Sequence, residues 1–352
     1  MAFIVDGTHR QVTRVELPLL TEMDLREHTV QYRAALASYQ TSRRFADWEA
    51  ALETVGHWLW TALVAPLRQA LPATGSVTVV VAGRLALLPV TAAVDPTTGQ
   101  AAVELLGWRF VPSSTALAAT SSAAAQRHNT NTLAVINPQP TNAAPLRWAR
   151  AEAAAVATRA GQVEVLEGED ATLVAVVHAL SERSVLHFAC HGLAAPQEPL
   201  NSYLLLADDE QLTIDRLILN ARLPLVRLAV LSACDTAVVG EVVPHEVVAM
   251  PSALIQLGAA AVIAAQWPVA DTTAAVFAAR FYELWDERTE PADAFAAAQR
   301  WLRTAQRGQI SALLRRCASD LDDLGELIAE LPLRQVPFSS PVDWAAFSYS
   351  GT

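Results

Sequence analysis

Apolar residues recur at helical intervals in the first part of the chain. Between residues 20 and about 70 the pattern includes Leu52, Val55 and Leu59, with tryptophans nearby. Such spacing is typical of helices that bury one face. We therefore expect residues 1–70 to form an N-terminal helical segment.

The pattern changes after this segment. Residues 76–81 form a β-branched run, and a second apolar stretch follows Gly83 and ends at Pro89, which together predict a pair of strands. Residues 118–132 are rich in Ala, Ser, Asn and Thr with little periodicity, so we predict a linker there. We group residues 71–130 as one region that contains the strand pair and the linker.

Short apolar runs alternate with helical patterns in the rest of the chain, residues 131–352. The expected strands are 132–136, 163–166, 184–189, 227–233 and 260–265, and the expected helices are 146–159, 172–180, 245–257, 271–285, 291–306 and 310–324. Continuous apolar strands separated by helices indicate a mostly parallel sheet that is covered on both faces. The pattern therefore predicts an α/β fold.

The charge and the amino-acid usage exclude several classes of mechanism. The 352 residues include 25 basic and 36 acidic ones, which gives a formal net charge of −11, and every one of the 25 is Arg. The lack of Lys excludes a Walker-A phosphate lysine, a Schiff-base lysine and a kinase-type lysine. The acidic balance disfavours nucleic-acid binding, which needs clustered positive charge.

The sequence carries neither a targeting signal nor a metal motif. Its start lacks the basic and apolar regions of a secretory signal, and the longest uncharged run, 247–270, is interrupted by Pro251 and polar residues. We therefore expect a cytoplasmic protein without a membrane span. The three cysteines form no CxxC pair and no dinucleotide-binding motif follows a strand, so we expect no metal and no cofactor.

Two of the expected strands end in the residues of a cysteine nucleophile. In such sheets, functional residues gather beyond the carboxyl ends of the strands. One strand leads to His191 and Gly192, and another leads to Cys234. A thiolate becomes an effective nucleophile when a nearby imidazole stabilises it and shuttles its proton, so His191 and Cys234 are the candidate catalytic pair. The backbone N–H groups of Gly192 and Cys234 are the candidate oxyanion donors.

The same residues also fit a purely structural interpretation. A Cys at the end of an apolar strand is most often a buried thiol, and a His beside Gly is often a loop residue, so spacing alone leaves both interpretations open. We expect His187, inside the strand, to be a hydrogen-bonded core histidine. Cys190 should point away from His191 on an extended strand and, like Cys317, is expected in the core.

Three ordered motifs resemble those of the CHAT-domain peptidases, which are caspase- and separase-like cysteine proteases. Residues 186–192 resemble the histidine motif of this family, residues 231–236 its nucleophile motif, and residues 266–271 its tryptophan-proline loop. The resemblance covers about residues 60 to 352. It implies a caspase-like three-layer α/β sandwich whose catalytic core is residues 131–352, and it implies a cysteine endopeptidase.

The resemblance also suggests which residues bind substrate. Asp271 lies where the related separases place a carboxylate in the S1 region, where it would pair with an Arg at P1. An Asp at this point is also a common helix N-cap, and that alternative stays open. Asp235 and Glu246 are further candidates for the substrate site. The nucleophile motif is not the QACxG of caspases, and His245 replaces the usual acidic residue of the family, so neither cleavage after Asp nor a pairing role for position 245 is expected.

The biological role that the resemblance implies is limited cutting of a dedicated protein partner. Members of the family often act in bacterial antiviral defence, where a sensor or repeat protein switches on the protease and a gasdermin-like pore-former is cut. We expect a protein substrate of this kind and no direct membrane insertion. Two alternatives remain open: a non-catalytic caspase-like interaction scaffold, and an acyltransferase or transpeptidase that uses the same dyad.

Overall fold

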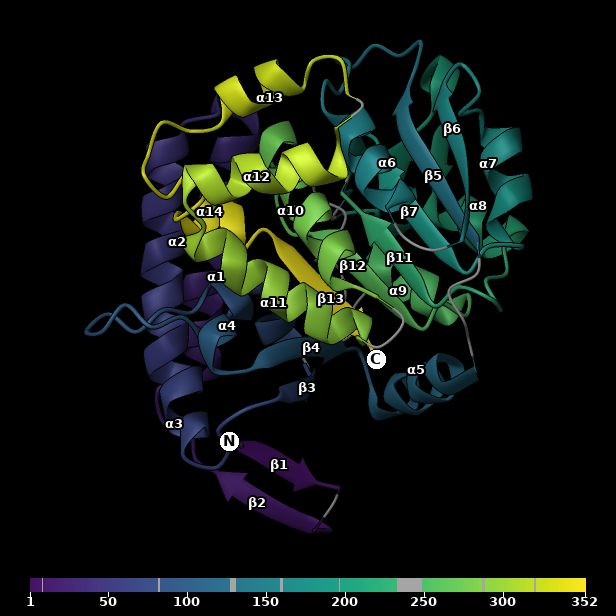
Figure 1. The fold of residues 1–352 in the computed structure, drawn as a ribbon. Coiled ribbons are helices and arrows are strands. Elements are labelled where there is room, and N and C mark those ends of the chain that lie inside the picture. Colours follow the sequence, from purple (N-terminus) through teal and green to yellow (C-terminus); the bar gives the residue numbers. More distant parts are fainter. Residues whose placement is uncertain are drawn as a thin grey trace.

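The apolar runs of the sequence build one large sheet. The computed structural model describes residues 1–7, 9–81, 83–126, 131–158, 161–195, 197–232, 249–286, 289–319 and 321–352. Within these residues, eight strands pair in the order β3-β4-β13-β12-β11-β7-β5-β6 (Figure 1). The strands are β3 (Ser76–Val80), β4 (Gly107–Val111), β5 (Asn131–Pro138), β6 (Gln162–Gly168), β7 (Val185–Ala189), β11 (Leu228–Leu231), β12 (Ala261–Ala265) and β13 (Phe347–Gly351). Neighbours are parallel except β12 and β13, which confirms a mostly parallel sheet.

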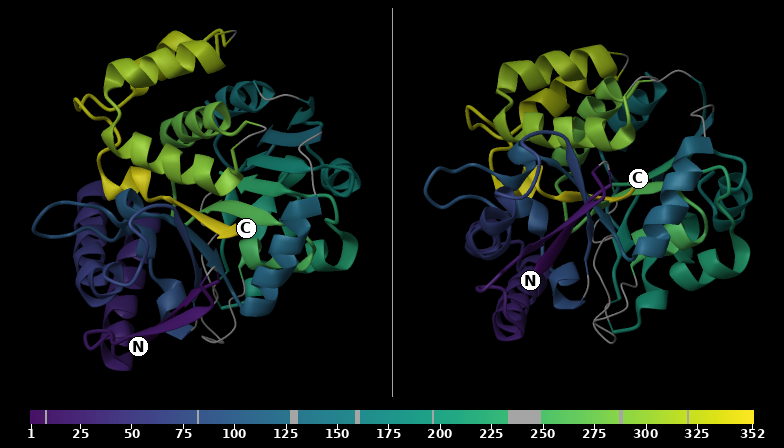
Figure 2. Two further views of the ribbon diagram at one scale, coloured as in Figure 1. Left: turned by 60° about the horizontal axis from the view of Figure 1, so that its bottom comes forward. Right: turned by 90° about the horizontal axis from the view of Figure 1, so that it is seen from below.

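Helices cover both faces of this sheet. One face carries α6 (Ala149–Ala157), α10 (Asp271–Leu284) and α11 (Pro291–Thr304), with α12 (Arg307–Cys317) packed on α10, and the other carries α7 (Leu173–Leu180), α8 (Ile214–Asn220) and α9 (Met250–Gln256) (Figures 1 and 2). Successive side chains of a strand point to opposite faces. In β11, Leu228 and Val230 join the first core, while Ala229 and Leu231 join the second. The predicted α/β arrangement of a sheet between two helical layers is therefore confirmed.

A small antiparallel sheet lies beside the carboxyl edge of the large one. It contains β8 (Gly192–Leu193), β9 (Tyr203–Leu205) and β10 (Gln211–Thr213), in the order β10-β9-β8. The Thr213 side chain accepts the backbone N–H of Arg216 and so caps α8. Because β8 directly follows His191, this small sheet connects to the candidate site.

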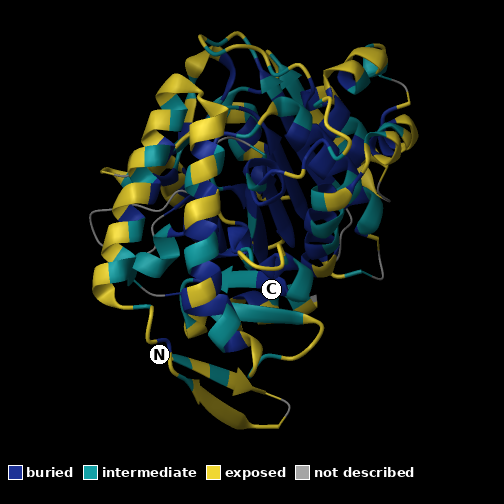
Figure 3. Ribbon diagram, turned by 90° about the vertical axis from the view of Figure 1, so that its left-hand side faces the viewer, coloured by how far each residue is buried: buried dark blue, intermediate teal, exposed yellow. Residues whose placement is uncertain are grey.

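The start of the N-terminal segment is a β-hairpin, whereas a helical segment was predicted. β1 (Ala2–Asp6) and β2 (Gln11–Val15) form an antiparallel hairpin that extends from the body and is largely exposed (Figure 3). Ile4 packs partly against the core while its neighbours Phe3 and Val5 are exposed, which is the period of a strand and not of a helix. Helices follow as α1 (Glu22–Ser42), α2 (Phe45–Leu59), the π-helical turn Trp60–Val64 and α3 (Ala65–Arg68).

The N-terminal helices share the main core. Trp48 of α2 packs edge-on against Trp267, with ring centroids 5.7 Å apart, and both side chains are buried. Trp267 lies in the loop that follows β12, and its Nε1 donates to the carbonyl of Val342. The α2 helix therefore supports the loop that leads to Asp271.

The predicted second strand at residues 83–89 is wrong. Gly83 has φ 64°, a left-handed conformation that turns the chain, and a 3₁₀ helix (Gly83–Leu87) follows it. A further 3₁₀ turn is Val90–Ala92. The β3 strand pairs in parallel with β4 instead, so its partner is distant in the sequence.

Two further predictions, one of a linker and one of a helix, are corrected. The expected linker at 118–132 is largely helical, because α5 (Ser114–Gln126) is rich in Ala, a strong helix former, and the Ser113 hydroxyl accepts the N–H of Ala116 at its start. Small side chains had hidden its periodicity. The single helix expected at 310–324 is interrupted, since α12 ends at Cys317 and α13 (Leu324–Glu330) is separate.

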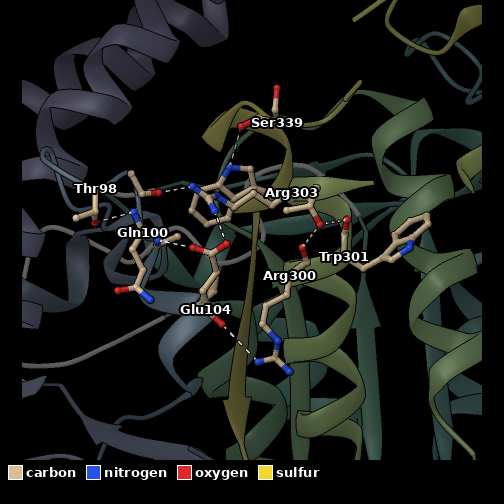
Figure 4. Close-up of polar contacts among 12 residues, drawn as sticks. Thr98, Gln100, Glu104, Arg300, Trp301, Arg303 and Ser339 are labelled. Carbon is tan, nitrogen blue, oxygen red and sulfur yellow. Dashed lines mark hydrogen bonds and ion pairs between the residues drawn. The ribbon is translucent and has the colours of Figure 1, made fainter. Parts of the chain in front are cut away.

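Polar contacts fasten the segment before β4 to α11 (Figure 4). The Arg303 guanidinium donates to Glu104 at 2.5 Å and to the carbonyl of Gly99 at 2.6 Å, and it lies 5.4 Å from the ring centre of Trp344. Glu104 belongs to α4 (Ala102–Leu105) and Trp344 to α14 (Pro341–Trp344). Arg303 thus joins three elements that are far apart in the sequence.

Candidate active site

His191 lies just beyond the carboxyl end of β7, as the sequence predicts. β7 and β11 are parallel neighbours, and their register places Phe188 beside Leu231. The N–H and the hydroxyl of Ser232 both donate to the carbonyl of Phe188 at 3.0 Å. His191 is three positions beyond Phe188, and Cys234 is three positions beyond Leu231. The two chain segments are thus in matched register up to the point where the described part of the second one ends.

Three of the predicted site residues lie outside the described residues. Cys234, Asp235 and Glu246, together with His245, fall in the segment 233–248. Their roles stay predictions.

The ring of His191 has a defined orientation. Its Nε2 donates to the carbonyl oxygen of Ala144 at 2.7 Å. A carbonyl only accepts, so Nε2 carries the proton, and in the neutral imidazole Nδ1 is then the lone-pair nitrogen. This hydrogen bond comes from the loop that follows β5, the strand on the other side of β7. The arrangement leaves Nδ1 as the nitrogen that can take up a proton.

The backbone next to His191 offers a hydrogen-bond donor. Gly192 is opposite Leu204 in the β8–β9 pair, and the N–H of Leu205 donates to the carbonyl of His191 at 2.8 Å. This pattern makes Gly192 and Leu204 a non-hydrogen-bonded pair, in which the N–H groups point away from the partner strand. The N–H of Gly192 is therefore directed away from β9, as an oxyanion donor requires.

His191 and Asp271 line the same pocket. It has a volume of about 490 Å³ and is lined by the 144–148 loop, by His191, by residues 270–272 at the start of α10, and by Glu330 of α13. The pocket therefore joins the loops after β5, β7 and β12, which are three of the strand ends where a parallel sheet gathers its functional residues.

Asp271 is a half-buried carboxyl group at the pocket. α10 begins at Asp271 with Ala270 as the N-cap residue, so the alternative that Asp271 caps its own helix is wrong. Its carboxylate accepts instead the N–H of Trp148, the N-cap residue of α6, at 2.8 Å. The pKa of Asp271 is raised to about 6, chiefly by burial and also by the charges of Glu152 and Glu330, while the hydrogen bond from Trp148 lowers it.

The rim of the pocket contains residues that sequence reasoning missed. Glu330 accepts the Trp148 indole N–H at 2.7 Å and pairs with Arg147, which also pairs with Glu326 at 2.7 Å. The Arg147 guanidinium lies 4.9 Å from the ring centre of Trp148. These residues are far apart in the sequence and belong to no motif, so the sequence gives no signal that brings them together.

The remaining histidine and cysteine predictions near the site concern the core. His187 is fully buried, with Nδ1 3.0 Å from the Tyr282 hydroxyl and Nε2 3.1 Å from a carboxylate oxygen of Glu152, which confirms a core histidine. Cys190 and Cys317 are both buried, as predicted. Burial is the main cause that raises the pKa of Cys317 and keeps it a thiol.

Two further searches cover only the described parts of the chain. Among these residues, no group of three or more His, Cys, Asp or Glu side chains is placed to hold a metal ion. Of the helices that the structure describes, none combines the length and the apolar character needed to cross a membrane.

The family model of the CHAT domain matches residues 53–352, so the chain belongs to the CHAT domain family. A comparison with curated proteins gives no match. The match to the family model confirms the resemblance that the three sequence motifs indicated.

Among solved structures, several are similar to the chain at low identity. It resembles Saccharomyces cerevisiae separase in its complex with securin (13% identity, TM-score 0.48, covering 96% of this chain and 23% of that chain). It also resembles the Arg specific cysteine proteinase gingipain R (10% identity, TM-score 0.42, covering 94% of this chain and 74% of that chain). A third similar structure is the complex of Porphyromonas gingivalis RgpB pro- and mature domains (12% identity, TM-score 0.42, covering 70% of this chain and 55% of that chain). The chain thus spans about half of the RgpB chain and under a quarter of separase.

Proposed function

We propose that this CHAT-domain protein is a cysteine endopeptidase with His191 and Cys234 as its catalytic pair. The observation that carries the proposal is the register of β7 and β11, which aligns the two strands that lead to His191 and Cys234. The orientation of the imidazole adds support, because Nε2 is committed to Ala144 and Nδ1 is left for proton transfer.

The proposed mechanism uses both residues twice. His191 Nδ1 takes the thiol proton, and the Cys234 thiolate attacks the scissile carbonyl. The N–H groups of Gly192 and Cys234 stabilise the resulting oxyanion. When the C–N bond breaks, His191 returns its proton to the leaving amine. Water, deprotonated by His191, then hydrolyses the thioester and regenerates the thiol.

We propose that the pocket beside His191 binds a basic P1 side chain. Asp271 supplies a carboxylate inside the pocket, and Glu330, which is paired with Arg147, lies at the pocket wall. A guanidinium pairs well with carboxylates in partly buried sites. With a pKa of about 6, Asp271 is mostly ionised at neutral pH, which supports an Arg preference.

We propose, as the family implies, that the protease makes limited cuts in a dedicated protein partner in the bacterial cytoplasm. A gasdermin-like pore-forming protein in an antiviral defence pathway is the proposed substrate, and a sensor or repeat protein is the proposed activator. Asp235 and Glu246 are proposed to contribute to the substrate site beside Cys234.

Cleavage of peptide libraries tests this function. Wild type should cut after Arg, with new N-termini identified by mass spectrometry, whereas Cys234→Ala should leave the peptides intact. An equal background from both proteins, even with the partner protein present, would instead favour the non-catalytic scaffold. Transfer of the acyl group to an added amine in preference to water would favour the transpeptidase.

A further inference from the structure

The small β8-β9-β10 sheet contacts the candidate catalytic histidine through its backbone. β8 begins at the residue after His191, and the N–H of Leu205 in β9 donates to the carbonyl of His191 at 2.8 Å. This ladder fixes where the Cα of His191 lies, but it leaves the rotation of the side chain unconstrained.

The turn between β9 and β10 contacts the loop that holds the imidazole. The N–H and the side-chain amide of Asn142 both donate to the Asp209 carboxylate, the first at 2.8 Å. The N–H of Asp208 donates to the carbonyl of Pro140 at 2.8 Å. Ala144, whose carbonyl accepts the proton of His191 Nε2, lies two residues after Asn142. The hairpin therefore holds His191 by its backbone and, through this loop, by its ring.

Backbone strain is concentrated at these contacts. Three of the five non-glycine residues with positive φ among those described are Asn137 (43°), Asp208 (59°) and Asp209 (58°). Asn137 lies near the end of β5, just before this loop, and its side-chain oxygen accepts the N–H of Leu146 at 2.8 Å. Left-handed conformations cost energy in residues with a Cβ and persist where surrounding contacts enforce them, often at functional sites.

The hairpin is itself anchored on a rigid element. The N–H of Ala207 donates to the carbonyl of Ala171, and the Glu210 carboxylate accepts the N–H of Leu173 at 2.9 Å, in the first residue of α7. The hairpin is thus bound to α7 on one side and, through Asp209, to the loop after β5 on the other. The loop is therefore held at a fixed place relative to α7.

We propose that the β9–β10 hairpin is a positioning element for His191 and that Asp209 is its main positioning residue. The Asp209 carboxylate holds Asn142 so that the carbonyl of Ala144 stays within hydrogen-bonding distance of His191 Nε2. Without this contact, the imidazole loses its fixed tautomer and samples other rotamers, while the substrate pocket keeps its charged groups. The catalytic consequence rests on the proposed function, whereas the orientation of the ring does not.

Matched glycine variants isolate the carboxylate. Asp209→Gly removes it at a position where glycine adopts φ 58° without strain. Asp208→Gly makes the same change at the neighbouring left-handed residue and keeps the N–H that donates to Pro140. Asp209→Asn retains an acceptor for the N–H of Asn142 and is the conservative rescue.

The first measurement needs no catalytic activity. Long-range ¹H–¹⁵N spectra of His191 should show a single Nε2–H tautomer in wild type, Asp208→Gly and Asp209→Asn, and a mixture of tautomers in Asp209→Gly. A single Nε2–H tautomer in Asp209→Gly would overturn the proposal, whether or not the protein is a protease.

The second measurement is covalent labelling of Cys234 by an acyloxymethyl ketone peptide with Arg at P1. Asp209→Gly should lower the maximal labelling rate about fivefold, the effect of one lost orienting hydrogen bond, with the half-saturating concentration unchanged. The other two variants should match wild type. Equal rates in the two glycine variants would refute a positioning role. Failure of wild type to react even with its partner protein present would refute the proposed function and leave the tautomer result standing.

Discussion

The Asp271→Asn substitution removes the charge from the pocket with little change of shape. The Asn side-chain oxygen can still accept the N–H of Trp148, which the carboxylate accepts at 2.8 Å in wild type. The substitution therefore separates the proposed recognition of a P1 cation from the structural contact to α6. The assay is kcat/KM for two fluorogenic peptides that differ only in Arg or Leu at P1.

The expected size follows from the environment of the carboxyl group. A hydrogen bond to a charged partner contributes about 1.5–3 kcal/mol, which corresponds to roughly a 10- to 150-fold change in kcat/KM. The Arg-to-Leu ratio of kcat/KM should fall by that factor in Asp271→Asn, while kcat/KM for the Leu peptide should change less than about twofold, since that side chain makes no ion pair.

The pH dependence gives the same prediction a second form. The pKa of Asp271 is raised to about 6, so below pH 6 the carboxyl group is mostly neutral in the free protein. The Arg-to-Leu ratio of wild type should therefore fall about five- to tenfold between pH 7 and pH 5. Taking the ratio cancels every pH effect that acts on both peptides equally. In Asp271→Asn the ratio should not vary with pH.

An unchanged ratio in Asp271→Asn would refute the assignment of this pocket to P1. A wild-type ratio that does not vary between pH 5 and pH 7 would refute the electrostatic argument, even if the variant were impaired.

Two stability predictions concern polar groups away from the pocket. Burial raises the pKa of Asp343 to about 6, so the folded state binds its proton more tightly than the unfolded state and stability is lost as pH rises from about 4 to 6. Asp343→Asn should raise the free energy of unfolding by about 2 kcal/mol at pH 7.5 and by much less at pH 4, as measured by urea denaturation at both values. Arg303→Met should lower it by about 2 kcal/mol, because Glu104 and the carbonyl of Gly99 lose their donor.

Exposed residues on the same layer serve as controls for these variants. Asp293→Asn and Arg315→Met change the same chemical groups at exposed positions and should alter the free energy of unfolding by less than about 0.5 kcal/mol. Asp343→Asn with the same effect at both pH values would contradict the burial argument. Arg303→Met with no greater effect than Arg315→Met would contradict the stabilising role of the contacts in Figure 4.

The central sheet was predictable where burial on two faces leaves a continuous apolar run. The strands that lead to His191 and Cys234 are of this kind, and the position of His191 at a strand end follows from them. The partner of β3 was not predictable, because its pairing with β4 depends on contacts between distant segments. The α5 helix was missed because its Ala and Ser side chains carry no hydrophobic period.

The pocket was only partly predictable for a related reason. Asp271 follows an apolar strand, so its place at the carboxyl edge could be inferred. Glu330 reaches the pocket from α13, more than 180 residues after the Trp148 indole that it binds, and no local pattern predicts that contact. The link from Asp209 to Asn142 depends equally on tertiary structure, since both residues are exposed and polar.

The most direct test of the central claim is mass spectrometry of the protein after treatment with the Arg acyloxymethyl ketone peptide. The account predicts one adduct per chain, located on Cys234, with loss of the adduct in Cys234→Ala and strongly slowed labelling in His191→Ala. Cys190 and Cys317 are buried and should stay unmodified in the same sample. Labelling of wild type no greater than that of Cys234→Ala, even with its partner protein present, would contradict the claim that His191 and Cys234 form a catalytic pair.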